Sequence, residues 1–148
     1  MNKQDDKGKI PFCGRSCSQV KDGDTIGLAG GGGGLVEASA LHAAVERSFL
    51  ETGHPQNLTC IHALGIGDRQ ERGMNRFAHV GMTSRVIGGH WVWSPRMQQM
   101  ARNNDIEAYV LPGGVIMQLM REVAAGRPGL ITHVAVSYTH LTLPTSNG

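Results

Sequence analysis

The residues best suited to chemistry in this sequence are clustered glycines. Of its 148 residues 21 are glycine, and many of them gather in four short loops, each after an apolar run: residues 30–34, 65–67, 88–90 and 112–114. Without a Cβ atom the glycine backbone can approach a ligand closely and present N–H groups to developing negative charge. The same residues suit turns that need left-handed backbone angles, so the pattern alone supports a binding loop and a simple turn equally.

The glycine run at residues 30–34 does not match the common phosphate-binding fingerprints. A Walker loop places Lys and Ser or Thr after its last glycine, whereas Leu35 and Val36 follow Gly34. A nicotinamide-dependent enzyme would place an acidic residue about 20 positions on, after a second strand, but Glu51 lies there at the end of an expected helix. Because the run precedes that helix, its N–H groups and the helix dipole favour an anion. An anion site and a simple turn therefore both remain open, and a nicotinamide cofactor is disfavoured.

Histidines and cysteines form no metal-binding pattern. His79 and His90 have no partner at ligand spacing, and His62 is expected to be a packed or solvent-side strand residue. The cysteines are too few for a disulfide scaffold, so free thiols are expected at Cys13, Cys17 and Cys60. No metal site is predicted.

Short apolar runs that alternate with amphipathic stretches predict repeated βα units. Strands are expected at residues 25–28, 58–64, 85–87 and 106–111, with a fifth from Leu130, and helices at 35–52, 75–80, 95–102 and 115–125. The predicted fold is α/β, a mostly parallel sheet flanked by helices. Ligands of such sheets bind beyond the carboxyl ends of the strands, so the four glycine-containing loops should line one rim.

Two of the expected helices have clear boundaries. Helix 35–52 ends at Gly53, which tolerates a left-handed cap, with Pro55 beyond it. Its apolar face is spaced by three or four residues: Leu35, Ala38, Leu41, Val45 and Phe49. Its wet face is expected to carry Glu46, Arg47 and Glu51. Helix 95–102 should begin with Ser94 as N-cap and Pro95 in the first turn, with Met97 and Met100 turned inward.

Composition and charge exclude several function classes. A chain of 148 residues with 40% hydrophobic side chains has room for one globular domain. Its net charge is +2, and no Lys/Arg block forms a stripe for tracking phosphates, so nucleic acid is not an expected partner. The first nine residues lack an apolar signal region, and no run approaches the ~18 apolar residues of a membrane span. No membrane association and a cytoplasmic location are expected.

Longer motifs, taken in order, make the chain resemble family I coenzyme A transferases. They begin with Asp22-Gly23-Asp24-Thr25-Ile26-Gly27, the run at 30–34 and Thr52-Gly53-His54-Pro55. The branch acting on acetate, propionate and similar short acids is similar in further segments, from residue 72 to residue 129: Arg72-Gly73, Arg76-Phe77-Ala78-His79, Val86-Ile87-Gly88-Gly89-His90-Trp91, Ser94-Pro95-Arg96-Met97, Glu107-Ala108-Tyr109 and Ala124-Ala125-Gly126-Arg127-Pro128-Gly129. The likeness covers residues 21–134, whereas residues 1–20 match only loosely.

The resemblance implies a fold in the coenzyme A transferase and sugar-phosphate isomerase group, and an activity. In this family a glutamate attacks an acyl-CoA thioester, a glutamyl-CoA thioester forms, and an acceptor carboxylate collects the CoA. Coenzyme A is then a substrate and no permanently bound cofactor is implied. Substrate and CoA are expected to contact the four loops at Gly31, Gly32, Gly33, Gly34, Gly65, Gly67, Gly88, Gly89, His90, Pro112 and Gly113.

The resemblance also implies that this chain is an N-terminal piece. The nucleophilic glutamate lies in the second half of these enzymes, and no glutamate here occupies a matching motif. We therefore expect no catalytic residue in this chain, no activity of the chain alone, and a missing C-terminal half or second subunit as partner. The intact protein is expected to be a homo-oligomer.

Two departures from the family stand out. The family usually reads Pro-Gln-Gly where this chain has Pro112-Gly113-Gly114, which places full activity in question. The segment 21–135 is expected to be the truncated α/β domain, whereas 136–148 resembles a translated sequencing adapter and is expected to be an assembly artefact. A phosphate-binding or sugar-phosphate-sensing module of the same fold group remains the alternative, because fold alone does not decide function.

Overall fold

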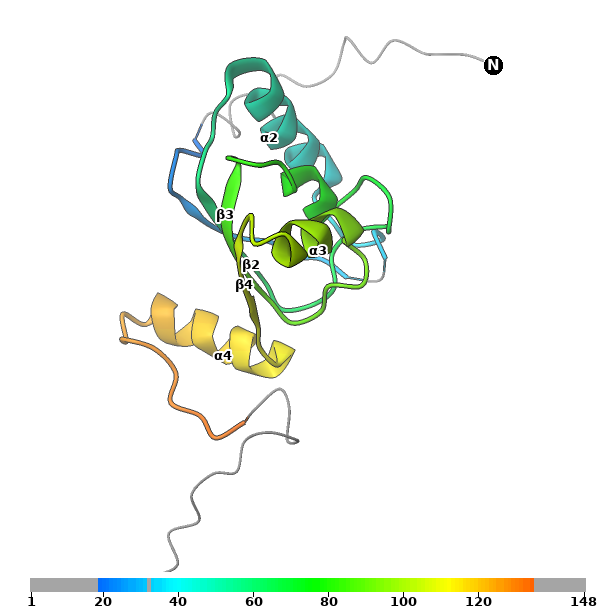
Figure 1. The fold of residues 1–148 in the computed structure, drawn as a ribbon. Coiled ribbons are helices and arrows are strands. Elements are labelled where there is room, and N and C mark those ends of the chain that lie inside the picture. The colour runs from blue at the N-terminus through cyan, green and yellow to red at the C-terminus, as the bar shows by residue number, and fades with distance from the viewer. Residues whose placement is uncertain (1–18, 32, 135–148) are drawn as a thin grey trace, which may run out of the picture.

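Figure 1 shows the chain as a computed structural model, which describes residues 19–31 and 33–134. Strands and helices alternate along it: β1 (Thr25–Gly27), α2 (Ser39–Thr52), β2 (Leu58–His62), the 3-10 helix η1 (Met74–Phe77), β3 (Thr83–Gly88), α3 (Pro95–Arg102), β4 (Glu107–Val110) and α4 (Gly113–Ala124). Gly32, Cys13, Cys17 and the tail at 136–148 lie outside the described residues, so the predictions for them stay predictions.

The four strands form one parallel sheet in the order β1-β2-β3-β4. Ile26 lies opposite Cys60, Cys60 opposite Val86, and Val86 opposite Ala108. Because strand order follows chain order and crossovers between parallel strands are right-handed, successive connections pass over the same face of the sheet. The prediction of an α/β fold with a parallel sheet is confirmed.

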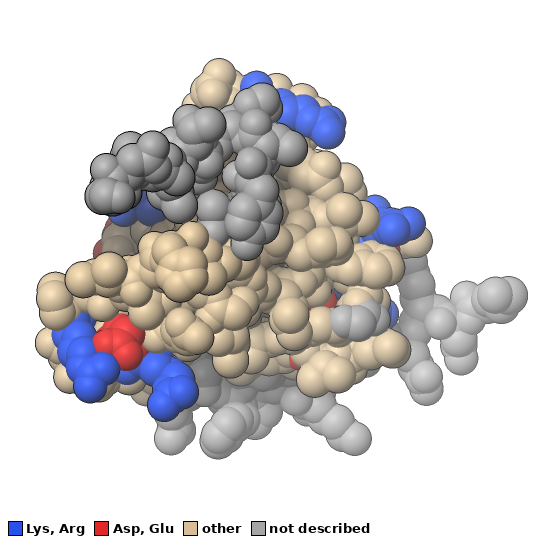
Figure 2. All heavy atoms as spheres, turned by 90° about the horizontal axis from the view of Figure 1, so that it is seen from below, with Lys and Arg blue, Asp and Glu red and all other residues tan. Residues whose placement is uncertain are grey.

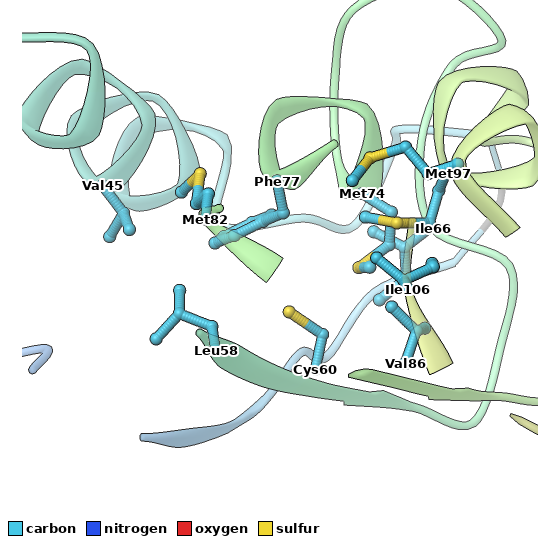
Figure 3. Packing of buried hydrophobic residues seen from close by; sticks show 11 residues of the cluster. Val45, Leu58, Cys60, Ile66, Met74, Phe77, Met82, Val86, Met97 and Ile106 are labelled. Atoms are coloured by element: carbon cyan, nitrogen blue, oxygen red, sulfur yellow. The ribbon is translucent and has the colours of Figure 1, made fainter. Parts of the chain in front are cut away.

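The core lies between that face of the sheet and the helices crossing it. Leu58 and Cys60 of β2 and Val86 of β3 point toward the helical layer, as Figure 3 shows. Buried side chains of α2, η1 and α3 pack against them from the helical layer: Val45, Met74, Phe77, Met97 and Met100. Burying each such side chain contributes roughly 1.5–3 kcal/mol, so α2, η1 and α3 are fixed to the sheet. By contrast, β4 is exposed along its whole length.

Helix α2 is shorter than the sequence predicts. It begins at Ser39 rather than at Leu35, and it ends at Gly53 with φ 78°, whose N–H donates to the Phe49 carbonyl. Val45 is buried and Phe49 packs against the core as predicted, but Leu35 is 85% exposed. Ala38 and Leu41 are also exposed, so the first three positions assigned to the apolar face are wrong. The buried face instead includes His42.

Glu46 does not lie on a wet face as predicted. Its carboxylate accepts hydrogen bonds from Arg76 Nη1 and, at 3.1 Å, from His79 Nε2, and only 14% of the Glu46 side chain is exposed. The two donors come from η1 and the residues just after it. A charged side chain can be buried here because two donors satisfy it. These partners lie 30 and 33 positions further along the chain.

Helix α3 has the predicted bounds but not the predicted cap. Met97 and Met100 are buried as expected. The hydroxyl of Ser94 donates to the Trp91 carbonyl at 3.3 Å instead of accepting from the helix. Asn75 Oδ1 accepts the N–H of Arg96 at 3.3 Å and so replaces the cap.

The fifth strand expected from Leu130 is not formed in the described part of the chain. Residues 130–134 are in neither helix nor strand and pair with neither edge of the sheet, β1 or β4. Ile131 is fully exposed and Val134 is partly so. This prediction is wrong over 130–134, because an apolar run becomes a strand only when an edge supplies hydrogen-bond partners.

Candidate functional site

The carboxyl ends of the four strands are held together by backbone hydrogen bonds. The N–H of Leu28 donates to the Ile61 carbonyl at 2.8 Å, and the N–H of Gly89 donates to the His62 carbonyl at 3.0 Å. Leu111 N–H continues the series to the Gly88 carbonyl at 3.3 Å. The loops after β1, β2, β3 and β4 therefore leave the sheet on the same side, at the carboxyl ends of the strands. We call this side the carboxyl edge of the sheet, and α4 also lies there (Figure 1).

Gly89 and Gly113 allow the backbone to approach the end of β2 closely. A Cβ atom on either residue would collide with the carbonyl oxygen of Ala63, which follows β2. The first turn of α4 thus rests directly against the ends of β2 and β3. Pro112, with φ −55°, is the residue before this turn. A side chain at position 113 would push α4 away from the sheet, so the two glycines set the position of α4.

Because Gly65 and Gly88 have no side chains, aromatic and imidazole rings fill the space beside them. A Cβ on Gly65 would overlap Nδ1 of His90 and the ring of Trp93, and one on Gly88 would overlap His62 and Trp91. His90 is thereby placed beside the loop after β2, as the rim hypothesis requires. These glycines have a packing role that the sequence analysis did not assign.

His62 is fully buried at the end of β2. Its Nδ1 donates to the Leu64 carbonyl at 2.8 Å, since a carbonyl can only accept. Burial lowers the pKa of His62, and the nearby His90 acts in the same direction. The ring is therefore neutral near pH 7, and its Nε2 has no hydrogen-bond partner among the described residues. Of the two expected alternatives, a packed or a solvent-side histidine, the structure shows the packed one.

The glycine run after β1 is joined to the loop after β2 by Glu37. The Glu37 Oε1 accepts the N–H of Gly67 at 2.6 Å, while its Oε2 is buried without a partner in the described part of the chain. The Glu37 side chain also lies against the position a Cβ of Gly30 would take. Sequence reasoning missed this residue, although a lone acidic residue after a glycine run could have drawn attention to it.

The run does not directly precede a helix N-terminus, where the sequence predicts it. Four residues separate Gly34 from α2, and the Glu37 carboxylate, not an external anion, accepts a loop N–H there. Gly33 and Gly34 have φ of 68° and 93°, in the left-handed region, which explains glycine at both positions. Gly33 faces the ring of Trp93, and Gly31 faces Leu64.

Trp93 is the second residue that sequence reasoning missed at the carboxyl edge. Its carbonyl accepts from the Arg69 N–H at 2.9 Å and from Asn75 Nδ2 at 3.1 Å. The Arg69 guanidinium lies 4.5 Å from the centre of its ring, a cation–π arrangement. Trp93 consequently ties the loop after β3 to the loop after β2, and buried Asn75 anchors both from η1.

An apolar pocket of about 330 Å³ opens beside these loops. Its walls are residues 27–30 after β1, Ala63 and Leu64 after β2, and Met117 and Met120 on α4. Figure 2 shows the α4 end of the molecule, where visible Lys, Arg, Asp and Glu side chains lie mainly toward the edges and uncharged residues occupy the centre. The carboxyl edge of the sheet thus combines close backbone turns with an apolar hollow.

Within the described ranges, no cluster of three or more His, Cys, Asp or Glu side chains could hold a metal ion. In the same part of the chain, no helix has both the length and the apolar character to cross a membrane. Cys60 is a free, buried thiol, and its burial raises its pKa to about 12. Burial therefore keeps the Cys60 thiol protonated near neutral pH.

Comparison with known proteins identifies similar chains. Residues 15–144 match the family model described as coenzyme A transferase. The acetate CoA-transferase YdiF of Escherichia coli strain K12 is 35% identical over 131 residues, covering 87% of this chain and 25% of that protein. The caffeate CoA-transferase of Acetobacterium woodii is 41% identical over 118 residues, covering 79% of this chain and 22% of that protein. The chain thus spans about a quarter of the length of these relatives.

Solved structures agree with the fold. The acyl-CoA transferase YdiF apoenzyme of Escherichia coli O157:H7 superimposes with a TM-score of 0.80 at 35% identity, over 84% of this chain and 24% of that one. The thioester complex of the same enzyme with CoA gives the same TM-score and covers 26% of that chain. At 35% identity, the two chains are similar in sequence as well as in fold.

Proposed function

The chain belongs to the coenzyme A transferase family, and we propose that it forms the N-terminal part of an acyl-CoA:carboxylate CoA-transferase. The whole enzyme would move CoA between a short-chain acyl-CoA and a carboxylate such as acetate or propionate. The similar proteins named for acetate and caffeate transfer support this reaction class. The observation that carries the proposal is the meeting of four glycine-containing strand ends beside one apolar pocket.

The reaction proposed for the whole enzyme proceeds through a glutamyl thioester. A glutamate from the second half attacks the thioester carbonyl, and CoA leaves as a thiolate, giving a mixed anhydride. The thiolate then attacks the glutamyl carbonyl and releases the first carboxylate. The acceptor carboxylate reverses both steps and collects the CoA. Each attack creates an oxyanion, so N–H donors at the carboxyl edge of the sheet are what the chemistry needs.

Two of the candidate N–H groups are already engaged. The N–H of Gly89 donates to His62 and the N–H of Gly67 to Glu37. We therefore assign the oxyanion contact to the remaining loop residues, above all Gly31, which faces Leu64, and Gly113, which faces the Ala63 carbonyl. His90, Gly65 and Gly88 would shape the site through packing.

The alternative, a phosphate or sugar-phosphate-sensing module, fits these residues less well. The pocket beside the glycine run is walled by leucine, methionine and alanine side chains and by glycine backbone, which suits an acyl group better than a phosphorylated sugar.

The partners of this chain follow from the same proposal. A second half, on the same chain or on a separate subunit, would supply the glutamate, and the intact enzyme would be a homo-oligomer. CoA and the carboxylate would be substrates, with no cofactor held between turnovers.

The test compares two proteins. The first is this chain, and the second joins residues 1–134 to the second half encoded in the source genome. Each is incubated with propionyl-CoA and labelled acetate, and labelled acetyl-CoA is measured. We expect transfer from the joined protein and none from the chain alone. Failure of the joined protein with any carboxylate acceptor, together with saturable binding of a sugar phosphate, would overturn the proposal in favour of the sensing module.

A further inference from the structure

We propose that the pocket between the ends of β1 and β2 and helix α4 binds the acyl group of the substrate, and that it selects acyl groups larger than acetyl: linear chains of about four to six carbons or arylalkyl groups. The inference rests on the proposed function and adds the substrate class. Its walls are residues 27–30, Ala63, Leu64, Met117 and Met120.

The position of the pocket links it to the reacting centre. Ala63 lines the pocket, and its carbonyl oxygen is the atom against which Gly89 and Gly113 pack. Gly30, at the start of the glycine run, lines the opposite wall. A thioester carbonyl held at these loops would direct its acyl chain into the hollow, because the hollow begins where the loops meet.

The size of the pocket argues against acetyl as its best occupant. A dry apolar cavity of about 150 Å³ accepts benzene, and this pocket measures about 330 Å³. An acetyl group would leave most of the wall without contacts. Each further methylene that becomes buried favours binding about fourfold, from the free energy of transferring it out of water.

The nature of the walls favours variable apolar chains. Met117 and Met120 are unbranched and polarizable, so they can adjust to acyl groups of different shape. Met117 is 57% exposed and Leu64 60% exposed, which leaves the pocket open for a ligand to enter. Among the residues that the structure describes, no charged side chain lines the pocket, so none of them would pair with a charged chain end such as that of a dicarboxylate.

Gly27 offers a means of closing the pocket without disturbing the fold. A Cβ at this position would lie 3.8 Å from Cε of Met120, at ordinary contact distance, and its φ is not in the left-handed region. A β-branched residue is also favoured in a strand. Gly27→Val should therefore narrow the pocket from β1, and Met120→Trp should fill it from α4. Thr25→Val is the control, since it places a valine in the same strand by exchanging a hydroxyl for a methyl group at an exposed position outside the pocket.

The binding test uses this chain labelled with ¹³C at its methionine methyl groups and three probes: acetate, hexanoate and 3-phenylpropionate. We expect hexanoate and 3-phenylpropionate to shift the Met117 and Met120 signals, with dissociation constants at least tenfold below that of acetate. The signals of buried Met82 and Met97 should stay in place and report an intact core. Gly27→Val and Met120→Trp should each abolish the preference, whereas Thr25→Val should keep it.

Several outcomes would overturn the inference: equal affinity for all three carboxylates, shifts at methionines other than 117 and 120, or a preference that survives whichever pocket-filling variant retains the core signals. In the joined protein, the ratio of kcat/KM for hexanoyl-CoA to that for acetyl-CoA should fall at least tenfold in that variant. If the joined protein transfers CoA but this ratio does not fall in the variant, the inference about the pocket is wrong and the proposed function stands. If the joined protein transfers no CoA while the chain still prefers hexanoate and 3-phenylpropionate over acetate, the proposed function is wrong and the pocket inference stands as a binding site.

Discussion

The Glu37 carboxylate accepts the backbone N–H of Gly67 at 2.6 Å and so joins the glycine run after β1 to the loop after β2. The two residues are 30 positions apart, and each loop carries residues proposed to contact the substrate. The second Glu37 oxygen is buried without a partner among the described residues. This contact holds the two loops at a fixed separation, which a rigid oxyanion site requires.

Replacing Glu37 by alanine is expected to lower the free energy of unfolding by about 1–3 kcal/mol, because the Gly67 N–H loses its acceptor. Glu37→Gln keeps an acceptor oxygen and should lose less. Urea unfolding of the three proteins measures the difference. Glu51→Ala, at an exposed position on α2, is the control and should leave stability nearly unchanged. Equal stabilities for Glu37→Ala and Glu51→Ala would show that the contact contributes nothing.

Glu46 pairs with Arg76 and His79 in a partly buried cluster between α2 and η1. Glu46→Ala should destabilise the fold by about 2 kcal/mol, less than the 3–5 kcal/mol of a fully buried pair, because Arg76 stays 24% exposed. The comparison is Glu107→Ala, whose partner Arg85 lies in solvent, and which should change little. Thermal unfolding of both variants measures the two losses of stability. A larger loss for Glu107→Ala than for Glu46→Ala would contradict the burial argument.

Local signals in the sequence predicted much of the fold. The start of α3 follows from Pro95, and its inward face from Met97 and Met100, all within one short segment. The end of α2 follows from Gly53, whose backbone angle favours glycine. The parallel sheet follows from the alternation of strands and helices. Each of these features depends on neighbours a few residues away.

The residues predicted wrongly depend on distant partners. The helical pattern places Glu46 in solvent, because its partners Arg76 and His79 lie 30 and 33 positions further along the chain. The start of α2 was placed too early because Leu35 extends the apolar spacing, whereas the Glu37 contact with Gly67 holds this segment outside the helix. Gly65 and Gly88, whose contact with substrate or CoA stays a prediction, also make room for His90, His62 and two tryptophans. No local pattern contains those contacts.

Stability should fall as the pH drops below about 6.5. Burial, and to a smaller extent the charge of Arg76, lowers the pKa of His42, and burial lowers that of His62. In the unfolded chain both imidazoles titrate near 6.5, so below that pH the unfolded state binds protons that the native state does not. The free energy of unfolding should decrease until the pH reaches the lowered native pKa values, and then level.

Urea unfolding between pH 7 and pH 5 measures this slope. The double variant His42→Gln/His62→Gln should show a flatter slope whatever its absolute stability, because only the titration is removed. Asp22 and Asp68, whose pKa values are lowered, lose stabilising charge only at lower pH, near their ordinary range. An unchanged slope in the double variant would assign the effect to other groups.

The Cys60 thiol is expected to be unreactive in the native chain. Burial raises its pKa to about 12, so almost no thiolate exists near pH 8. In a Cys13→Ser/Cys17→Ser background, Ellman's reagent should find no accessible thiol in buffer and one per chain in concentrated urea. Rapid reaction in buffer would mean that the core between β2 and η1 opens readily.

Gly113 and Gly114 are adjacent glycines with opposite surroundings. A Cβ at position 113 would come within 2.8 Å of the Ala63 carbonyl oxygen, whereas one at position 114 would meet nothing within 4 Å. Gly113→Ala should therefore cost about 1–3 kcal/mol in stability by forcing α4 away from the sheet. Gly114→Ala should be neutral or stabilise by up to about 1 kcal/mol through helix propensity. In the joined transferase, Gly113→Ala should also lower kcat, because α4 carries one wall of the proposed acyl pocket. Gly114→Ala should keep near-normal turnover. Urea unfolding and transfer assays on the pair measure both effects. If the two variants behave alike, contact between α4 and the end of β2 does not position the site, and the assignment of Gly113 to the oxyanion contact fails with it.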